Sequence, residues 1–403
     1  RDLSFRLAVA ESWHSTKRNF FKILGQFIFI GGTILLLSAL GYSIIFILQS
    51  LVETHWSAYA LPSAVIAMTI LQGMYLLNLV FSTVGVFYII VDFMDDEGFL
   101  PSLPAWFEPE APRTQTSWSF GKALAFAAVA VVFGIGVGTY NTNFLSNYSL
   151  TEPLTISHRG VDNKNGVQNS LEALQKTSQL GPSYVEMDVQ ETKDKQFVVM
   201  HDFNLNALTG VKKRPSELTL SELQQLTVKE NGMTAPVVSF DDYLAEAKRL
   251  KQPLLIEIKA PSQYSSDLVD RFISQYKEVI LDQGHIIHTL TFDIAKQLKE
   301  KEPDFYVGYI LPFNIVGPPV SNVDFFTMEY TTLNKNFIEA AHNDGKDVYA
   351  WTANDEDTMT RMMFYGVDGI ITDNLSLLQK TVKTDLSDPT YSDKLLYFVT
   401  GIG

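Results

Sequence analysis

Long uncharged stretches dominate the first third of the chain. Residues 23–52, 54–91 and 123–151 contain no lysine, arginine, aspartate or glutamate. Each stretch exceeds the roughly 20 apolar residues that a helix needs to cross a bilayer. The pattern predicts three transmembrane helices, at about 23–50, 60–91 and 122–142. Three buried helices of a soluble core are the alternative, which would require three unusually long uncharged runs in succession.

From residue 154 onward the pattern changes to short apolar runs that alternate with amphipathic stretches. Repeated strand–helix units of this kind are typical of a parallel sheet covered by helices. We predict eight strands, at residues 154–159, 184–190, 254–259, 286–291, 305–311, 325–330, 348–352 and 369–372. Eight strands with intervening helices predict a TIM (β/α)8 barrel. The fold class is therefore α/β, a barrel preceded by an all-α transmembrane region.

The intervening segments support this periodicity. Helices are predicted at residues 170–179, 268–281, 294–300, 336–343 and 356–364, and a short one at 220–226. Glycines stand where helix C-terminal caps are expected, at Gly181, Gly284, Gly345 and Gly366. The pattern is looser between His201 and Phe240, where turn-forming residues are frequent.

These patterns divide the chain into four parts. A lead-in of residues 1–21 mixes apolar and basic side chains and is predicted to be an amphipathic helix on the membrane surface, with a cytoplasmic helix as the alternative. The transmembrane region covers residues 22–150, and the barrel domain covers residues 151–383. A tail, 384–403, has a polar first half and an apolar second half, and the sequence assigns it no role.

The basic residues predict an orientation. Five lysines and arginines precede the first span, none lies between Glu53 and Leu61, and the link from Asp92 to Lys122 contains Arg113 and Lys122. Because basic residues favour the cytoplasmic side, the N-terminal side is predicted to be cytoplasmic. Three crossings then put everything after Tyr140 outside the cytoplasm, as part of a multi-pass cell-membrane protein.

The overall charge narrows the range of partners. The chain has 45 acidic and 31 basic residues, a formal net charge of -14. Binding a polyanion usually requires a basic surface, so nucleic acid is not predicted as a partner. A small phosphodiester remains compatible, because a few local cations can balance its charge.

Chemically active residues gather at the ends of the predicted strands, where barrel active sites lie. Glu186 and Asp188 are two residues apart, so on a strand both point to one face and can offer oxygen ligands to a hard cation. Glu257 could supply a third carboxylate, with Lys259 beside it. Solvated acids at a strand edge are the alternative.

Two histidines stand out from the others. His158 and His201 end strands beside polar residues, and imidazole can give or take a proton near neutral pH. His285, His288 and His342 lack this context and are predicted to have surface or packing roles. Arg159 offers a planar fork that suits two phosphate oxygens, with an ion pair at the barrel rim as the alternative.

The ordered set of motifs resembles one family. His158-Arg159-Gly160, Glu186-Met187-Asp188-Val189, His201-Asp202 and Glu257-Ile258-Lys259 are similar to the motifs of the glycerophosphodiester phosphodiesterases, over residues 154 to about 380. The resemblance implies that Glu186, Asp188 and Glu257 hold one divalent cation, Ca²⁺ or Mg²⁺. It implies that His158 and His201 are the acid/base pair.

The resemblance also implies substrate contacts. Lys259 would face the phosphate, and Trp351 would form an aromatic wall for the glycerol, with core packing as the alternative role of Trp351. The looser segment after His201 would be a small insertion over the barrel mouth. The multi-span N-terminal region is similar to that of membrane-bound members from Gram-positive bacteria.

Two departures from the family pattern concern substrate contacts. The family commonly has Pro-Glu-Asn-Thr after the first strand, whereas this chain has Val167-Gln168-Asn169-Ser170. An arginine often found shortly after the His-Asp motif is absent, with Ala207 and Leu208 in that region. The substrate contacts are therefore expected to differ from those of soluble members.

The sequence as a whole predicts a membrane-anchored, metal-dependent glycerophosphodiester phosphodiesterase with its catalytic domain outside the cytoplasm. Its expected partners are membrane lipids and a glycerophosphodiester, either free or part of a glycerol-phosphate polymer, which it would hydrolyse to glycerol 3-phosphate and an alcohol. A lysophospholipase D-like lipid headgroup hydrolase is the alternative enzyme. A non-catalytic lipid- or polymer-binding barrel is a third possibility, against which the intact histidine and carboxylate set argues.

Overall fold

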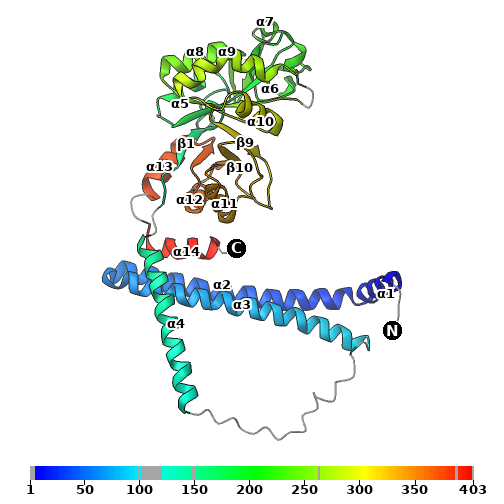
Figure 1. Cartoon of the computed structure of the whole chain (residues 1–403), viewed down its shortest axis with the longest axis vertical. Coiled ribbons are helices and arrows are strands. Elements are labelled where there is room, and N and C mark those ends of the chain that lie inside the picture. The colour runs from blue at the N-terminus through cyan, green and yellow to red at the C-terminus, as the bar shows by residue number, and fades with distance from the viewer. Residues whose placement is uncertain are drawn as a thin grey trace. The chain divides into compact units, whose positions relative to one another are not determined.

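The chain folds into two units in a computed structural model that describes residues 5–98, 100, 120–147, 150–261, 264–385 and 389–401 (Figure 1). One unit comprises Arg1–Tyr148 with Thr390–Gly403, and the other comprises Ser149–Pro389. Residues 1–4 of the lead-in, and most of the link that contains Arg113, lie outside the described residues.

The first unit is helical. Its helices are α1 (Phe5–Arg18), α2 (Phe20–His55), the short η1 (Ser57–Tyr59), α3 (Ala60–Asp96), α4 (Phe120–Asn147) and α14 (Tyr391–Gly401). Within the described residues, three helices are long and apolar enough to cross a membrane: Phe20–His55, Ser57–Asp96 and Gly121–Ser146. The prediction of three long apolar helices is confirmed.

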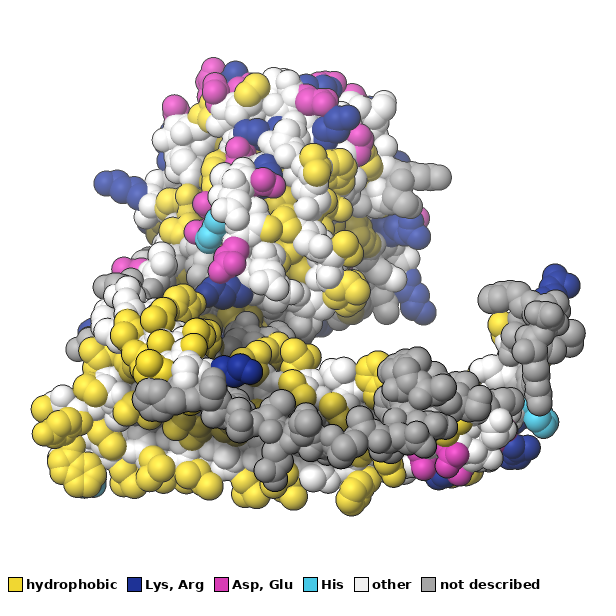
Figure 2. Space-filling model, turned by 60° about the horizontal axis from the view of Figure 1, so that its bottom comes forward, with side chains coloured by type: hydrophobic (Ala, Val, Ile, Leu, Met, Phe, Trp, Pro, Cys, Tyr) yellow, Lys and Arg dark blue, Asp and Glu magenta, His cyan; other side chains and the backbone are white. Residues whose placement is uncertain are grey.

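Apolar side chains cover the outside of these helices, as the hydrophobic surface in Figure 2 shows. Polar side chains instead pair between the helices: Asn141, which is fully buried, exchanges hydrogen bonds of 2.9 and 3.2 Å with Gln72, and Asn78 donates to Ser38 at 2.8 Å. An apolar exterior with polar contacts between helices is the arrangement expected in lipid.

The C-terminal tail contributes to this unit through α14. Leu395 is fully buried in an apolar cluster that includes Ala64, Met68 and Leu145. The backbone N–H of Ser392 donates to Glu53 Oε1 at 2.9 Å. The apolar half of the tail therefore stabilises the helical unit, a role that its sequence alone did not reveal.

The second unit is a closed barrel of eight parallel strands. They are β1 (Leu154–Ser157), β2 (Tyr184–Glu191), β7 (Leu254–Ile258), β8 (Ile286–Thr289), β9 (Val307–Leu311), β10 (Phe325–Glu329), β11 (Asp347–Trp351) and β12 (Gly369–Thr372). The barrel closes because β1 pairs in parallel with both β2 and β12. Every strand overlaps its predicted range, so the TIM-barrel prediction is confirmed.

Helices alternate with the strands around the barrel. They are α5 (Leu171–Ser178), α8 (Phe240–Leu250), α9 (Leu268–Gln283), α10 (Phe292–Lys301), α11 (Lys335–Asn343), α12 (Glu356–Tyr365) and α13 (Leu375–Asp385). Ser170, Ser239 and Asp355 cap α5, α8 and α12 by accepting a backbone N–H. Two of these helices, α8 and α13, were not predicted from the sequence.

One glycine allows an aromatic side chain to pack tightly inside the barrel. A Cβ on Gly308 of β9 would lie 2.2 Å from the ring of Phe325 on the neighbouring strand, so only glycine fits this position. Phe325 is fully buried and packs with Ile156, Leu255, Tyr349 and Ile371.

An insertion follows β2 at the C-terminal side of the barrel. It contains β3 (Phe197–Val199), α6 (Asn206–Thr209), η4 (Pro215–Glu217), α7 (Leu220–Leu223), the hairpin β4 (Thr227–Glu230) and β5 (Met233–Pro236), and β6 (Val238–Ser239). It has an apolar cluster of its own, which includes Leu205, Leu223 and Val228. This cluster extends to Val167, in the segment after β1, and so joins the insertion to the region of the site.

Candidate active site

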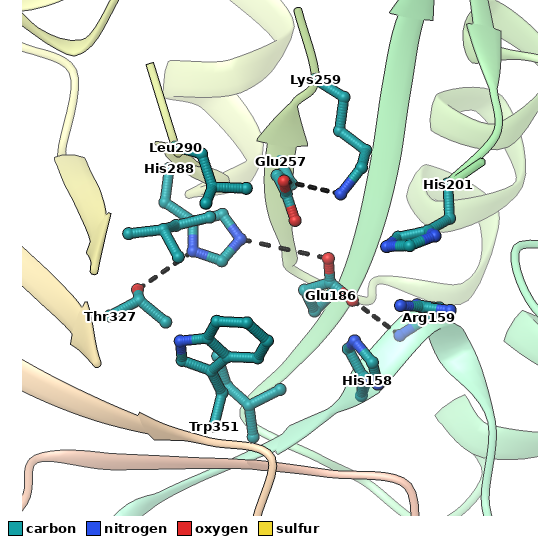
Figure 3. Close-up of a pocket in the computed structure, with 12 residues that line it drawn as sticks. His158, Arg159, Glu186, His201, Glu257, Lys259, His288, Leu290, Thr327 and Trp351 are labelled. Carbon is teal, nitrogen blue, oxygen red and sulfur yellow. Dashed lines mark hydrogen bonds and ion pairs between the residues drawn. The ribbon is translucent and has the colours of Figure 1, made fainter. Parts of the chain in front are cut away.

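A cavity of about 130 Å³ opens at the C-terminal ends of the strands. Figure 3 shows its lining, which brings together the predicted residues His158, Arg159, Glu186, His201, Glu257, Lys259 and Trp351. Four further residues, which were not predicted from the sequence, also line it: Leu290, Ile310, Thr327 and Ile371. A further lining residue, His288, had been assigned a surface or packing role.

The end of β1 forms a tight turn, η3 (His158–Gly160), that presents both a side chain and a backbone donor. Arg159 has φ 52°, a left-handed conformation that costs energy in a non-glycine residue, and its backbone N–H donates to Glu186 Oε2 at 2.7 Å. Gly160 follows with φ 69°, and a Cβ there would lie 3.1 Å from the Tyr243 hydroxyl. The turn therefore requires glycine at this position, and it helps to orient Glu186.

Two carboxylates of β2 are buried on the same strand but have different surroundings. Glu186 is 2% exposed and faces the cavity (Figure 3), whereas Asp188 is fully buried and is not among the lining residues. Asp188 Oδ2 accepts a hydrogen bond of 2.7 Å from Asn169, and its Oδ1 lies 3.3 Å from Lys259 Nζ. Arg159 Nε lies 3.9 Å from Asp188 Oδ2. Asp188 is thus surrounded by cationic and amide donors.

Glu257 and Lys259 stand at the end of β7. Lys259 Nζ donates to Glu257 Oε1 at 2.8 Å, and both residues are buried. Lys259 therefore lies between two carboxylates, Glu257 and Asp188, and is held with its ammonium group at the cavity.

Burial and mutual repulsion separate the pKa values of the three acids. Burial, together with the charges of Asp188 and Glu257, raises the pKa of Glu186 well above its usual value. Burial and the Asp188 charge raise the pKa of Glu257 to about 7. Burial would also raise the pKa of Asp188, but Lys259, His201 and Arg159 outweigh it and lower that pKa. A cation near Glu186 and Glu257 would favour their charged forms.

The two predicted acid/base histidines each have a carboxylate partner. His158 Nδ1 lies 2.8 Å from Asp373 Oδ1, and Asn354 fixes Asp373 through a 2.7 Å hydrogen bond. His201 Nδ1 lies 2.7 Å from Asp202 Oδ1. Burial lowers the pKa of His201, although the Asp188 charge opposes this effect. Both rings line the cavity, so their Nε2 sides are available to a bound molecule.

His288 is the site residue that the sequence analysis missed. It is 2% exposed, its Nδ1 lies 3.0 Å from Thr327 Oγ1, and its Nε2 lies 4.0 Å from Glu186 Oε1 (Figure 3). Ligand atoms of Glu186, Glu257 and His288 all lie within 4.8 Å of one another, so this buried group could hold a metal ion. Burial lowers the pKa of His288 to about 3, so the ring is neutral at physiological pH.

Strand register is the signal that could have found His288. On neighbouring strands β7 and β8, Glu257 pairs with His288, so the two side chains belong to one layer of the barrel. The other two histidines have the predicted roles: His285 accepts a hydrogen bond from the backbone N–H of Leu254 in the packed interior, and His342 pairs with Asp368 at the surface.

Gln168, one of the departures from the family pattern, connects Arg159 to the insertion. Its Oε1 accepts from Arg159 Nη1 at 2.7 Å, and its Nε2 donates to Glu230 Oε1 at 2.8 Å. The Gln168 backbone N–H also donates to Glu230 Oε2 at 2.8 Å. A glutamate at position 168 would face Glu230 with like charge, so the amide suits this chain.

A parallel barrel whose strand ends present carboxylates, two cations and two histidines is suited to phosphate-ester chemistry. Comparison with known families gives the particular class. Residues 158–377 match the glycerophosphoryl diester phosphodiesterase family, and residues 1–137 match the membrane domain of glycerophosphoryl diester phosphodiesterase. The chain belongs to the glycerophosphoryl diester phosphodiesterase family and is a phosphoric diester hydrolase.

Individual relatives agree with this assignment. A glycerophosphodiester phosphodiesterase from Caldanaerobacter subterraneus is 26% identical over 247 residues, which cover 57% of this chain and 98% of that protein. A solved glycerophosphodiester phosphodiesterase from Parabacteroides distasonis is 26% identical, with a TM-score of 0.50, over 58% of this chain and 98% of that one. A phosphodiesterase from Oleispira antarctica, solved in complex with the product sn-glycerol-3-phosphate, has the same fold at 19% identity and a TM-score of 0.50, over 59% and 99% of the two chains.

The match to the membrane domain and the three apolar helices identify the chain as a membrane protein.

Proposed function

We propose that the protein is a membrane-anchored, metal-dependent glycerophosphodiester phosphodiesterase. It hydrolyses a glycerophosphodiester, either free or part of a membrane or wall glycerol-phosphate polymer, to glycerol 3-phosphate and an alcohol. One observation carries this proposal: Glu186 and Glu257 meet Arg159, Lys259 and two histidines in a single cavity at the strand ends. The glycerol 3-phosphate bound by the Oleispira antarctica relative supports the choice of product.

A divalent cation fits the donor set. Glu186 and Glu257 offer oxygen ligands, and Asp188 is the third ligand that the family motif implies. His288 Nε2 is buried, has no hydrogen-bond partner within the described part of the chain and lies in the same cluster, so the cavity has a nitrogen donor in addition. Carboxylate oxygens favour Ca²⁺ or Mg²⁺. When bound, the cation supplies Lewis-acid polarisation of a phosphoryl oxygen.

The remaining residues provide charge and proton transfer. Arg159 and Lys259 bind the phosphate oxygens and balance the charge that develops on them. His158 and His201 share the two proton transfers: one from the attacking water and one to the departing alkoxide. Trp351 forms a wall for the glycerol.

Product analysis tests this function. The purified full chain is incubated with glycerophosphocholine, a lysophospholipid and a polyglycerol-phosphate polymer, with and without chelator, and ³¹P NMR identifies the phosphorus-containing products. We expect glycerol 3-phosphate from at least one substrate, and none from it after chelation or with His201→Ala. Release of phosphocholine from glycerophosphocholine would overturn the proposal, because the other phosphoester bond would then have been cleaved.

We also propose that the barrel lies outside the cytoplasm. The N-terminal end of α2 and the C-terminal end of α3 lie next to each other in the helical unit, since Lys22 Nζ is 2.8 Å from Asp92 and Arg18 pairs with Glu97. Both ends therefore lie on the same side of the membrane. The acidic residues at the C-terminal end of α3 are thus balanced by basic residues from the N-terminal side, which supports a cytoplasmic location for both.

Protease accessibility tests the orientation. When protease is added to intact wall-free cells, we expect digestion of the domain after Asn141. The link between Asp92 and Lys122 should be spared. Protection of the barrel until the membrane is opened would reverse the orientation and favour a cytosolic glycerophosphodiester as the substrate.

A further inference from the structure

One loop of the barrel exposes large apolar side chains. Residues 312–322, between β9 and β10, contain no charged residue. Phe313 and Ile315 are 64% and 74% exposed, and Val316 and Val320 are 94% and 100% exposed. The other exposed large hydrophobic residues of the described barrel unit are at most 43% exposed. The loop is therefore the one concentrated apolar patch of this kind among the described barrel residues.

Hydrogen bonds within the loop stabilise this conformation. Asn314 Oδ1 accepts from the backbone N–H groups of Val316 and Gly317 at 2.8 and 2.9 Å, and Asn314 Nδ2 donates to the Gly317 carbonyl at 2.8 Å. The Asn314 backbone N–H donates to Thr332 Oγ1, which anchors the loop to the segment after β10. The apolar side chains thus point outward from an internally bonded loop, and their exposure is part of its folded conformation.

The loop belongs to the side of the barrel that carries the cavity. It follows the C-terminal end of β9, and Ile310, two residues before it, lines the cavity. Leu290, Trp351 and Ile371 also contribute apolar side chains to the cavity lining. A cavity of about 130 Å³ is smaller than the roughly 300–1,000 Å³ of pockets that enclose drug-sized ligands, so only a small polar headgroup fits inside. The rest of a larger substrate has to remain at the mouth.

We propose that this loop inserts Phe313, Ile315, Val316 and Val320 into the acyl layer of a lipid surface. If the proposed function holds, the enzyme then favours glycerophosphodiesters that are presented at that surface over freely soluble ones. An uncharged loop has no attraction for the phosphodiester itself, so its partner has to be apolar. The chain's own apolar helices belong in a bilayer, which makes lipid available to the barrel.

A protein partner fits the loop less well than a lipid surface does. Stable protein interfaces bury about 800 Å² on each partner and usually combine an apolar centre with a polar rim. Four side chains on one loop do not supply that area, whereas binding to a lipid surface scales with the apolar area buried and needs no complementary protein surface.

Substrate discrimination tests the proposal in the full chain. The variant I315S/V316S/V320S, reconstituted in phosphatidylcholine vesicles, is compared with the wild type on glycerophosphocholine and on lysophosphatidylcholine, which share a headgroup. We expect kcat/KM on lysophosphatidylcholine to fall by about 10-fold or more, while kcat/KM on glycerophosphocholine changes by less than about 2-fold. The matched control L180S/L281S, which changes exposed leucines outside the loop, should alter neither. An equal effect on both substrates, or no effect, would contradict the proposal.

A direct contact measurement is independent of activity. Because the chain has no cysteine, Val320→Cys can be labelled with a single environment-sensitive fluorophore, with Leu281→Cys as the control. In vesicles that contain brominated lipid, we expect quenching at position 320 and not at 281. Equal quenching at the two positions, or quenching at neither, would overturn lipid insertion. Failure of the wild type to release glycerol 3-phosphate from any substrate would instead count against the proposed function and leave the quenching result intact.

Discussion

The charged side chains at the two ends of the barrel have different surroundings. At the C-terminal end, Arg159 Nε, Asp188 Oδ1 and His288 Nε2 are buried without a hydrogen-bond partner among the described residues. At the N-terminal end, His285 Nε2 is the corresponding case, but two partly exposed acids bond to neighbouring strands and helices. Asp324 accepts the backbone N–H of Val307 at 2.7 Å and pairs with Lys299 at 2.9 Å, while Asp368 accepts the N–H of Val348 at 2.7 Å.

This difference predicts that the stability of the barrel and its catalytic activity depend on opposite ends. A buried polar atom without a partner costs free energy of folding, so such atoms persist where a bound molecule or ion completes them. Closed networks such as that of Asp324 tie one strand to the next and stabilise the barrel. We therefore expect changes at the C-terminal end to remove activity with little loss of stability, and changes at the N-terminal end to do the reverse.

Removing a site histidine should give the largest effect. We expect His158→Ala and His201→Ala each to lower kcat by about 10²-fold or more, because each removes a proton-transfer group. Steady-state kinetics with thermal unfolding of the same samples checks this. His342→Ala, at the surface, is the control and should retain full activity. A well-folded His201→Ala enzyme with normal kcat would remove that residue from the mechanism.

Breaking a network at the opposite end should affect stability alone. Asp324→Ala leaves the Val307 N–H without its acceptor and removes the carboxylate partner of Lys299, so we expect the free energy of unfolding to fall by about 1–3 kcal/mol. Denaturant unfolding measures this change, and kcat should stay within about 2-fold of the wild type. A large loss of kcat in the folded variant would show that the two ends are not separable.

A change at His288 tests whether the C-terminal end of the barrel binds a metal ion. We expect His288→Gln to weaken Mn²⁺ binding by about 10-fold, because it removes a nitrogen donor from the cluster with Glu186 and Glu257. Calorimetric titration gives the affinity, and pulsed EPR of bound Mn²⁺ reports a coordinated ring nitrogen. His285→Gln is the control. Nitrogen coupling that survives in His288→Gln would exclude this histidine as a ligand.

The smallest effect is expected at Gln168. Gln168→Glu places a carboxylate against Glu230, and we expect a loss of about 1 kcal/mol in the free energy of unfolding. Adding Glu230→Gln should restore most of it, since the second change removes the repulsion. A double variant no more stable than Gln168→Glu alone would mean that Glu230 does not set the preference for an amide.

The sequence predicted the barrel and most of its site because both follow local rules. Each strand is an apolar run of the expected length, and residues such as Glu186 and Asp188 are close in sequence and share a face. His288 was missed because its role depends on pairing with Glu257 across two strands, 31 positions apart in the chain. The packing of α14 against Ala64 and Leu145 was missed for the same reason, since it joins the last residues to distant helices.

Metal removal tests the central claim most directly. Without a cation, the buried acids Glu186, Asp188 and Glu257 lie close together, and the repulsion between them raises the pKa values of Glu186 and Glu257. We predict that exhaustive chelation abolishes the formation of glycerol 3-phosphate from a glycerophosphodiester substrate, and that Ca²⁺ or Mg²⁺ restores it. An unchanged rate of product formation after complete removal of divalent cations would contradict the account.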